Sequence, residues 1–249
     1  MQLNTLKDKV ALITGAGGVM GRAVVRGLIE DGCRIALIDV NSSSLAPLES
    51  EYGDRVCAEA CDISDAEAVA TAHKRIVRRL GPVDILVNNA GILSNNKIEA
   101  TSVAEWKRVM SVNLDGAFFW SQAVVPDMKA RRWGRIISTS SLAAKTGGLT
   151  AGTAYSVSKG AMNALTFSLA RELAAFGITA NGIAPAYVKT PMITEQLNEA
   201  QLQELLGNIP VGRFCEPEEF AHAVRFLASP LAGFITGEIL DLNGGLLMD

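Results

Sequence analysis

Short runs of apolar residues alternate with longer helix-like segments along the whole chain. Each apolar run is four to six residues long, which is the length of a strand buried on both faces of a sheet. The pattern predicts strands at residues 10–14, 34–38, 55–60, 85–88, 135–139, 178–183 and 238–242. Seven strands with helices between them are typical of a parallel sheet that is covered by helices on both sides.

The segments between these strands carry apolar residues at helical spacing. They predict helices at residues 20–31, 65–80, 103–130, 154–176 and 217–228. No linker, repeat or boundary interrupts the alternation, so we expect one doubly wound α/β domain over residues 1–249. Residues 190–210 differ, because they follow a strand and carry a short polar helical pattern rich in Glu and Gln. We predict a substrate lid there, with an ordinary surface connection as the alternative.

The composition argues against several classes of function. The chain has 249 residues, 49% of them hydrophobic, and a net charge of −3, and its basic cluster Arg131, Arg132 and Arg135 is too short for a nucleic-acid site. The four cysteines form no CxxC pair, and His73 and His222 lie in separate predicted helices, so we expect no metal site. No apolar run reaches ~18 residues and no leader is visible. We therefore expect a soluble cytoplasmic protein with no membrane partner.

A glycine-rich turn joins the first predicted strand to the first predicted helix. Residues 15–21, Gly-Ala-Gly-Gly-Val-Met-Gly, place free backbone amides at a helix N-terminus, where a pyrophosphate can bind. The next strand ends in Asp39, whose carboxylate can bind a ribose 2′-hydroxyl and would repel a 2′-phosphate. This favours NAD over NADP. Arg22 could also reach a phosphate, although a solvated side chain is the simpler interpretation.

Tyr155 and Lys159 lie four residues apart in the predicted helix 154–176, so they share one face. Lowering the pKa of a tyrosine from ~10 to ~7 takes about 4 kcal/mol, which a neighbouring ammonium can supply. Ser141 follows the strand at residues 135–139, at the sheet edge where ligands bind in this class of fold. The three residues predict a proton-transfer site at that edge.

Taken in order along the chain, these motifs resemble the compact, single-domain short-chain dehydrogenases/reductases. The resemblance rests on Thr14-Gly15 to Gly21, Asp39, Asp62, Asn88-Asn-Ala-Gly91, Asn113, Ser141, Tyr155-x-x-x-Lys159 and Pro185 to Thr190. It implies a Rossmann fold with a seven-stranded parallel sheet, and Asn113, Ser141, Tyr155 and Lys159 as catalytic residues. It also implies that NAD is bound by Gly15, Gly18, Val19, Met20, Gly21, Asp39, Asp62, Ile63, Asn89, Ala90, Gly91, Tyr155, Lys159, Pro185, Val188 and Thr190.

The resemblance also assigns roles within that set. Asp62 is expected at the adenine with Ile63 stacking nearby, and the Asn-Asn-Ala-Gly stretch at the adenosine ribose. Val188 and Thr190 are expected to hold the carboxamide of the nicotinamide, while Asn113 would hold a water beside Lys159. Two positions depart from the family pattern. Val19 and Ala186 stand where glycine is common, which leaves the fit of the cofactor open.

The expected function is an NAD(H)-dependent oxidoreductase that transfers a hydride between a secondary alcohol, or its ketone, and nicotinamide, with Tyr155 as general acid/base. One alternative is an NADPH-dependent 3-oxoacyl thioester reductase of the same fold, which Asp39 disfavours. The other is a non-catalytic NAD-binding regulatory protein, which the intact set of Ser141, Tyr155 and Lys159 disfavours.

The expected partners are a small alcohol or ketone and further copies of the chain. By resemblance, the substrate would be lined by Leu93, Ser94, Leu142, Leu149, Thr150, Thr153, Tyr187 and Ile193. Lys145 and Lys189 could bind an anionic tail, although solvated lysines are the simpler interpretation. Family members pair through the two helices that contain residues 117–128 and 165–173, so the resemblance implies a homotetramer.

Overall fold

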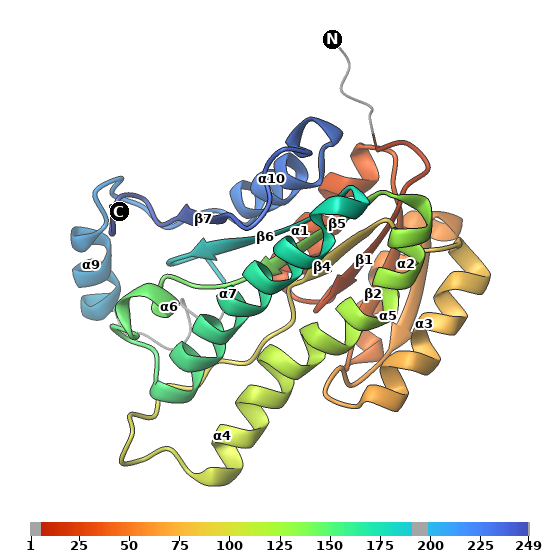
Figure 1. Ribbon diagram of the computed structural model, residues 1–249. Coiled ribbons are helices and arrows are strands. Elements are labelled where there is room, and N and C mark those ends of the chain that lie inside the picture. Colours follow the sequence, from red (N-terminus) through yellow and green to blue (C-terminus); the bar gives the residue numbers. More distant parts are fainter. Residues whose placement is uncertain (1–5, 191–198, 249) are drawn as a thin grey trace.

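Seven strands form one parallel sheet in the computed structural model, which describes residues 6–190 and 199–248 (Figure 1). The strands are β1 (Val10–Thr14), β2 (Arg34–Asp39), β3 (Val56–Ala60), β4 (Ile85–Asn88), β5 (Gly134–Thr139), β6 (Ile178–Pro185) and β7 (Ile239–Leu242). Their order is β3-β2-β1-β4-β5-β6-β7, and every neighbouring pair is parallel. The predicted single-domain, doubly wound α/β fold is confirmed.

Helices cover both faces of the sheet (Figure 1). Helices α1 (Val19–Glu30) and α10 (Pro217–Ala228) pack against each other on one face, while α3 (Ala66–Leu80), α5 (Gly116–Arg131) and α7 (Thr153–Leu173) cover the other. Side chains of β1 alternate between the two cores, with Ile13 in the first and Leu12 in the second. Burial on both faces explains why the strands appear in the sequence as continuous apolar runs.

Helix α2 (Ser42–Tyr52) was not predicted from the sequence. Only Leu45 and Leu48 of this helix are buried, and Pro47 lies inside it, so its helical pattern is weak. The helix begins after Asn41, whose side-chain oxygen accepts a hydrogen bond from the Ser43 amide at 3.0 Å. This N-cap is the local signal that could have revealed it.

The helix predicted at residues 103–130 consists of three parts. Helix α4 (Val103–Met110) passes into a π-helical turn (Ser111–Asp115), which continues into α5. Asn113 lies inside this turn and is fully buried. A π-helical turn carries a wider backbone ring than an α-helix and is frequent at functional sites. The sequence showed a continuous helical pattern and gave no sign of the extra width.

The strand order reverses between β1 and β4, so that a crevice opens at the carboxyl ends of the strands. Helix α6 (Ala143–Thr146) follows β5 closely and lies near that edge. Within the lid, residues 191–198 lie outside the described residues, and α9 (Glu199–Asn208) follows them. The lid stays a prediction.

Two kinds of feature are absent from residues 6–190 and 199–248, namely a helix that could cross a membrane and a side-chain cluster that could hold a metal ion. No helix there is long and apolar enough to cross a membrane. No three His, Cys, Asp or Glu side chains in that part of the chain are grouped in a way that could hold a metal ion.

Candidate functional site

A cleft of about 560 Å³ opens at the carboxyl edge of the sheet. It is lined by the glycine-rich turn, the ends of β2 and β3, the stretch after β4, the end of β5, the start of α7 and the segment after β6. All sixteen predicted cofactor residues line this cleft, and so does Ser141. Among the predicted catalytic residues, Asn113 alone lies behind the lining. The fold thus brings together residues from seven separate parts of the chain, and Arg108 and Val112 add an eighth.

The glycine-rich turn presents backbone amides to the cleft. Helix α1 makes its first intrahelical hydrogen bond when the Arg22 amide donates to Gly18 O at 2.9 Å, so the amides of the three preceding residues have no helical acceptor. Gly15 has a φ of +66°, and a Cβ at Gly21 would collide with Gly15 O. Val19 is 39% exposed, so its side chain lies at the rim and does not fill the turn. A pyrophosphate fits this arrangement.

The carboxylate of Asp39 closes the far side of the turn. Its two oxygens accept hydrogen bonds from the backbone amides of Gly17 and Asn41, each at 3.1 Å. A carboxylate has about four lone-pair sites, so it can still accept hydrogen bonds from ribose hydroxyls. Arg22 is not a solvated residue, because its guanidinium donates to Gly17 O and Ser44 O, each at 2.8 Å. Arg22 therefore links the glycine-rich turn to the start of α2.

The ends of β3 and β4 form the next part of the lining. Hydrogen bonds from Ser64 to the Asp62 carboxylate lower the pKa of that group, and Arg108 lies 3.5 Å from the same side chain. The hydroxyl of Thr14 accepts from the amides of Asn89 and Ala90, each at 3.0 Å. These contacts hold the loop after β4 against the end of β1, so the floor of the cleft consists of backbone and small side chains.

Tyr155, Lys159 and Ser141 meet at the inner end of the cleft. Lys159 is 3% exposed, its Nζ donates to Thr139 O at 2.6 Å, and it lies 5.7 Å from the centroid of the Tyr155 ring. The Ser141 hydroxyl forms a hydrogen bond with the Tyr155 side chain and accepts another from the Ala143 amide at 3.1 Å. The predicted proximity of the three groups is therefore present.

The pKa values of this pair differ from the sequence-based expectation. Burial raises the pKa of the Tyr155 phenol above its ordinary value, and the hydrogen bond with Ser141 offsets this in part. Burial also lowers the pKa of Lys159 to about 8. Both shifts have one cause, because removal of water disfavours each charged form. The structure does not show the expected lowering of the Tyr155 pKa to ~7, because burial shifts this pKa in the opposite direction.

Asn113 lies directly behind the loop after β4. Its side-chain oxygen accepts from the Ile92 amide at 2.8 Å, and its Nδ2 donates to Ile92 O and to Ser158 Oγ, each at 3.0 Å. A Cβ at Gly91 would lie 3.3 Å from Asn113 Oδ1 and 3.5 Å from Lys159 Nζ. The absence of a side chain at Gly91 therefore lets Asn113 and Lys159 approach the loop from either side.

None of the described residues expected around the substrate belongs to the lining of this cleft. The Ser94 hydroxyl donates to Glu105 at 2.5 Å, and Tyr187 is buried with its ring 6.4 Å from that of Phe214, beside a second cavity of about 150 Å³. Lys145 pairs with Asp241 at 2.6 Å and Lys189 with Glu216 at 3.2 Å, so both lysines have carboxylate partners. Ile193 lies outside the described residues.

Several functional contacts were missed in the sequence. Thr139 contributes its carbonyl to Lys159, and Ser158 contributes its hydroxyl to Asn113. Thr139 could have been suspected as the last residue of a predicted strand at the ligand edge. A backbone carbonyl leaves no mark in a sequence, however, and Ser158 appears there only as one more polar residue of a helix.

The buried amine of Lys159 predicts a specific pH dependence of stability. Its pKa falls from an ordinary 10.5 to about 8, so between these values the unfolded chain binds the extra proton and stability rises with pH. The free energy of unfolding of the wild type, minus that of Lys159→Met, should therefore rise by about 3 kcal/mol across this window. Urea unfolding at a series of pH values measures this difference. Lys74→Met, at an exposed site on α3, is the control, and a flat difference for Lys159→Met would contradict the argument.

Comparisons with known proteins show the family of the chain. A family profile described as "Enoyl-(Acyl carrier protein) reductase" matches residues 15–247. The 3-oxoacyl-[acyl-carrier-protein] reductase FabG of Vibrio cholerae is 39% identical and covers 98% of this chain and 99% of its own. A 3alpha-hydroxysteroid dehydrogenase of Mediterraneibacter gnavus is 37% identical over 96% of this chain and 97% of its own.

Among solved structures, one titled short-chain dehydrogenase/reductase SDR: glucose/ribitol dehydrogenase, from Brucella melitensis, superposes with a TM-score of 0.88. It is 30% identical in sequence and covers 98% of this chain and 99% of its own. The profile match, the similarity over full length and the shared fold agree with the ordered motifs of the cleft. The chain belongs to the short-chain dehydrogenase/reductase family of oxidoreductases, which bind a nicotinamide cofactor.

Proposed function

We propose that this protein is an NAD(H)-dependent oxidoreductase acting on a secondary alcohol or its ketone, with Tyr155 as general acid/base. The observation that carries the proposal is the meeting of Tyr155, Ser141 and buried Lys159 at the inner end of the cleft. A bound nicotinamide would supply the hydride acceptor or donor. The glycine-rich turn, Asp39 and the segment after β6 would hold the cofactor.

The side chains divide the remaining chemistry between them. The Tyr155 phenol takes the hydroxyl proton of an alcohol, or gives a proton to the ketone oxygen. Ser141 can donate or accept, so it can form a hydrogen bond to that oxygen in either state. Lys159 carries three donors, of which Thr139 O accepts one, and its charge favours the phenolate form of Tyr155. Asn113 fixes the Ile92 backbone beside this group and would hold the relay water.

The preference for NAD rests on the charge around Asp39. A 2′-phosphate placed here would meet a carboxylate, and the nearby Arg22 is engaged by two backbone carbonyls. Arg108, whose guanidinium belongs to a residue of the lining, lies beside Asp62. Two like charges at close range repel by about 1 kcal/mol or more near a protein surface. Charge therefore favours the dinucleotide without the phosphate.

A second candidate is the reduction of a 3-oxoacyl thioester with NADPH. It is favoured by the names of relatives such as the FabG protein of Vibrio cholerae. The carboxylate partners of Lys145 and Lys189 reduce the positive charge available to an anionic carrier at the cleft. Initial rates with NADH and NADPH on a 3-oxoacyl thioester, beside rates with NAD+ on a panel of secondary alcohols, separate the two candidates. A non-catalytic role is disfavoured by the complete Ser141, Tyr155 and Lys159 set.

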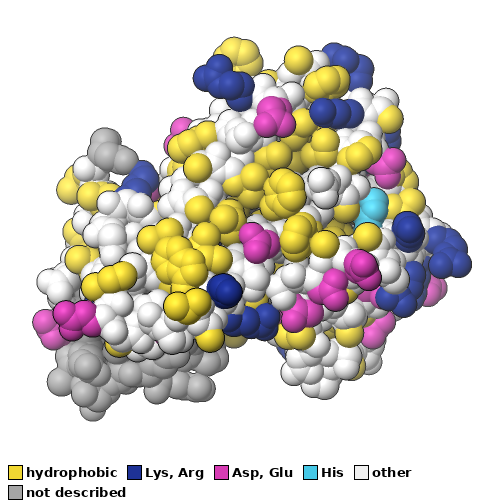
Figure 2. Space-filling model, turned by 60° about the horizontal axis from the view of Figure 1, so that its bottom comes forward, with side chains coloured by type: hydrophobic (Ala, Val, Ile, Leu, Met, Phe, Trp, Pro, Cys, Tyr) yellow, Lys and Arg dark blue, Asp and Glu magenta, His cyan; other side chains and the backbone are white. Residues whose placement is uncertain are grey.

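We also propose that the chain forms a homotetramer. Several residues of the two helices expected at the interface are core residues, including Trp120, Val124 and Leu173. Their neighbours are exposed, however, and Figure 2 brings this side forward and shows hydrophobic side chains gathered on it. The exposed members on α4, α5 and α7 are Val103, Trp106, Phe118, Val157 and Phe167. A second set of exposed apolar side chains lies on α10 and in the segment that directly follows it, and consists of Phe226, Leu231 and Phe234. Two separate apolar surfaces suit a tetramer with twofold symmetry.

Tyr155→Phe tests the acid/base assignment. Removal of the phenolic hydroxyl group should lower kcat by roughly 10²- to 10⁴-fold, because positioned proton transfer contributes about that much. The affinity for NADH should stay within about two-fold, since the ring remains. Steady-state rates and calorimetric titration with NADH measure the two effects. Tyr52→Phe, on α2, is the matched control, and retained turnover in Tyr155→Phe would refute the assignment.

Asp39→Ala tests the choice of nucleotide. Loss of the carboxylate removes both the acceptor for the ribose hydroxyl and the repulsion of a 2′-phosphate. The ratio of kcat/KM for NADH over NADPH should fall about ten-fold or more. Asp54→Ala, at an exposed site just after α2, should leave the ratio unchanged. An unaltered ratio in Asp39→Ala would remove Asp39 from the specificity argument.

Sedimentation equilibrium tests the assembly. The wild-type protein should have about four times the chain mass of 26.4 kDa. Phe118, on α5, is 46% exposed, and Phe118→Lys places a charge in the proposed interface. This variant should sediment as a dimer held by the second surface. A monomeric wild type would contradict the proposal.

A further inference from the structure

The segment that follows β6 leaves the sheet and lines the cleft. Val188 and Thr190 contribute to the lining. Behind the segment, the Cys215 amide donates to Tyr187 O at 3.0 Å, and the Lys189 amide donates to Cys215 O at 2.9 Å. These two bonds form an isolated parallel bridge between Val188 and Cys215. The position of the lining segment therefore depends on the position of Cys215.

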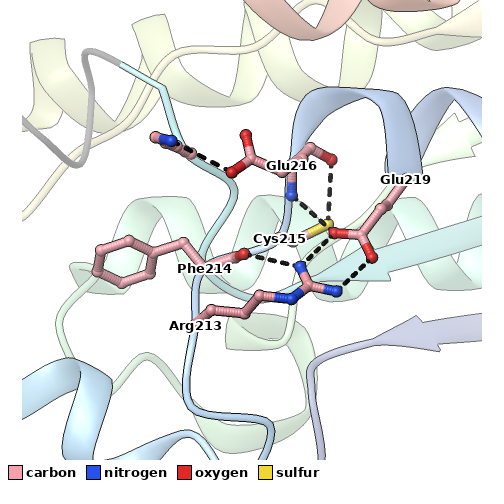
Figure 3. A network of polar contacts seen from close by, with 6 residues as sticks. Arg213, Phe214, Cys215, Glu216 and Glu219 are labelled. Atoms are coloured by element: carbon pink, nitrogen blue, oxygen red, sulfur yellow. Dashed lines mark hydrogen bonds and ion pairs between the residues drawn. The ribbon is translucent and has the colours of Figure 1, made fainter.

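Cys215 is itself held by a network of charged groups (Figure 3). The Arg213 guanidinium donates to the two oxygens of Glu219 at 2.6 and 2.8 Å. One of these oxygens also accepts from the Glu216 amide at 2.9 Å, which caps the start of α10. Glu219 thus binds a residue on each side of Cys215. These hydrogen bonds lower the pKa of Glu219 to about 2, so its carboxylate stays charged at ordinary pH.

Two further contacts connect the same pair of segments. Lys189 Nζ donates to the Glu216 carboxylate at 3.2 Å. The Phe214 ring lies edge-on to the buried Tyr187 ring, with 6.4 Å between centroids. A polar contact at one position and an aromatic contact at another fix the register of residues 213–216 against residues 187–190.

The bidentate pair is partly exposed, and an exposed pair by itself contributes little to stability. Its geometry serves a different purpose, since a planar guanidinium and a carboxylate with two parallel bonds permit one relative orientation. The neighbouring pair of Arg26 and Glu218 lacks this geometry, because its single contact is 3.9 Å long. Glu218 and Glu219 both lie in the first turn of α10, but Glu219 forms two short hydrogen bonds with its arginine whereas Glu218 forms one long contact.

We infer that Glu219, together with Arg213, is a positioning residue that holds Val188–Thr190 in place for the nicotinamide end of the cofactor. The inference rests on the proposed function, because only a nicotinamide cofactor gives this end of the cleft its role. Glu219 lies outside the lining of the cleft and acts through Cys215. Its loss should affect ligands that reach Val188 and should spare ligands that end before it.

The test compares NADH with ADP-ribose, which lacks the nicotinamide but keeps the rest of the dinucleotide. Dissociation constants from calorimetry are measured for the wild type, Glu219→Ala, Glu219→Gln and the control Glu218→Ala. Glu219→Ala should weaken the binding of NADH about five- to ten-fold and that of ADP-ribose less than about two-fold. Glu219→Gln, which keeps the shape of the side chain, should show a smaller loss in the same sense. Glu218→Ala should change neither value.

The outcomes separate the inference from the proposed function. A loss confined to NADH supports the positioning role. Equal losses for both ligands, or no loss in either Glu219 variant, overturn it and leave the proposed function intact. Failure of the wild type to bind NADH or ADP-ribose overturns the proposed function, and with it the inference.

Discussion

The buried amine of Lys159 is the constraint on which the site depends. It lies at 3% exposure, and the acceptor that the fold gives it is a neutral carbonyl at the end of β5. A carboxylate in that position would fix the ammonium as a permanent ion pair. With a neutral acceptor, burial brings the pKa of the amine to about 8, so its proton can be exchanged close to neutral pH. With this neutral partner, burial rather than an ion pair determines the pKa of Lys159.

This constraint links Lys159 to Tyr155. Burial disfavours the ammonium and the phenolate alike, as their opposite pKa shifts show. Both shifts come from the loss of water, so one buried environment affects the protonation of both residues. Space beside Lys159 comes from the backbone, since a Cβ at Gly91 would lie 3.5 Å from Lys159 Nζ and 3.3 Å from Asn113 Oδ1. The π-helical turn contains Asn113, whose side chain accepts a hydrogen bond from the backbone of the loop after β4. A local widening of one helix therefore positions a side chain against that loop.

The fold and the cleft lining could be predicted because they depend on local signals. Apolar runs located all seven strands, and motifs that follow strand ends fall at one edge of any parallel sheet. Helix α2 escaped because only two of its residues are buried, and Arg22 was misjudged because its partners are backbone carbonyls. The pKa of Tyr155 was misjudged for a related reason. The spacing of Tyr155 and Lys159 shows which charges are neighbours but gives no measure of the water they lose on burial.

The two ends of the cleft are built on different principles. At the end proposed for adenosine, the lining includes carboxylates at or shortly after strand ends, such as Asp39 and Asp62, so one substitution there changes the charge that a ligand meets. At the end proposed for nicotinamide, the lining includes a backbone segment that is hydrogen-bonded to Cys215, which lies in a separate part of the chain. Because the two ends of the cleft are built from different strand ends and different contacts, the residues of one end can vary independently of those of the other. Under the proposed cofactor binding, nucleotide choice can change without an effect on the position of the nicotinamide at Tyr155, and that position can change through Glu219 without any substitution in the lining.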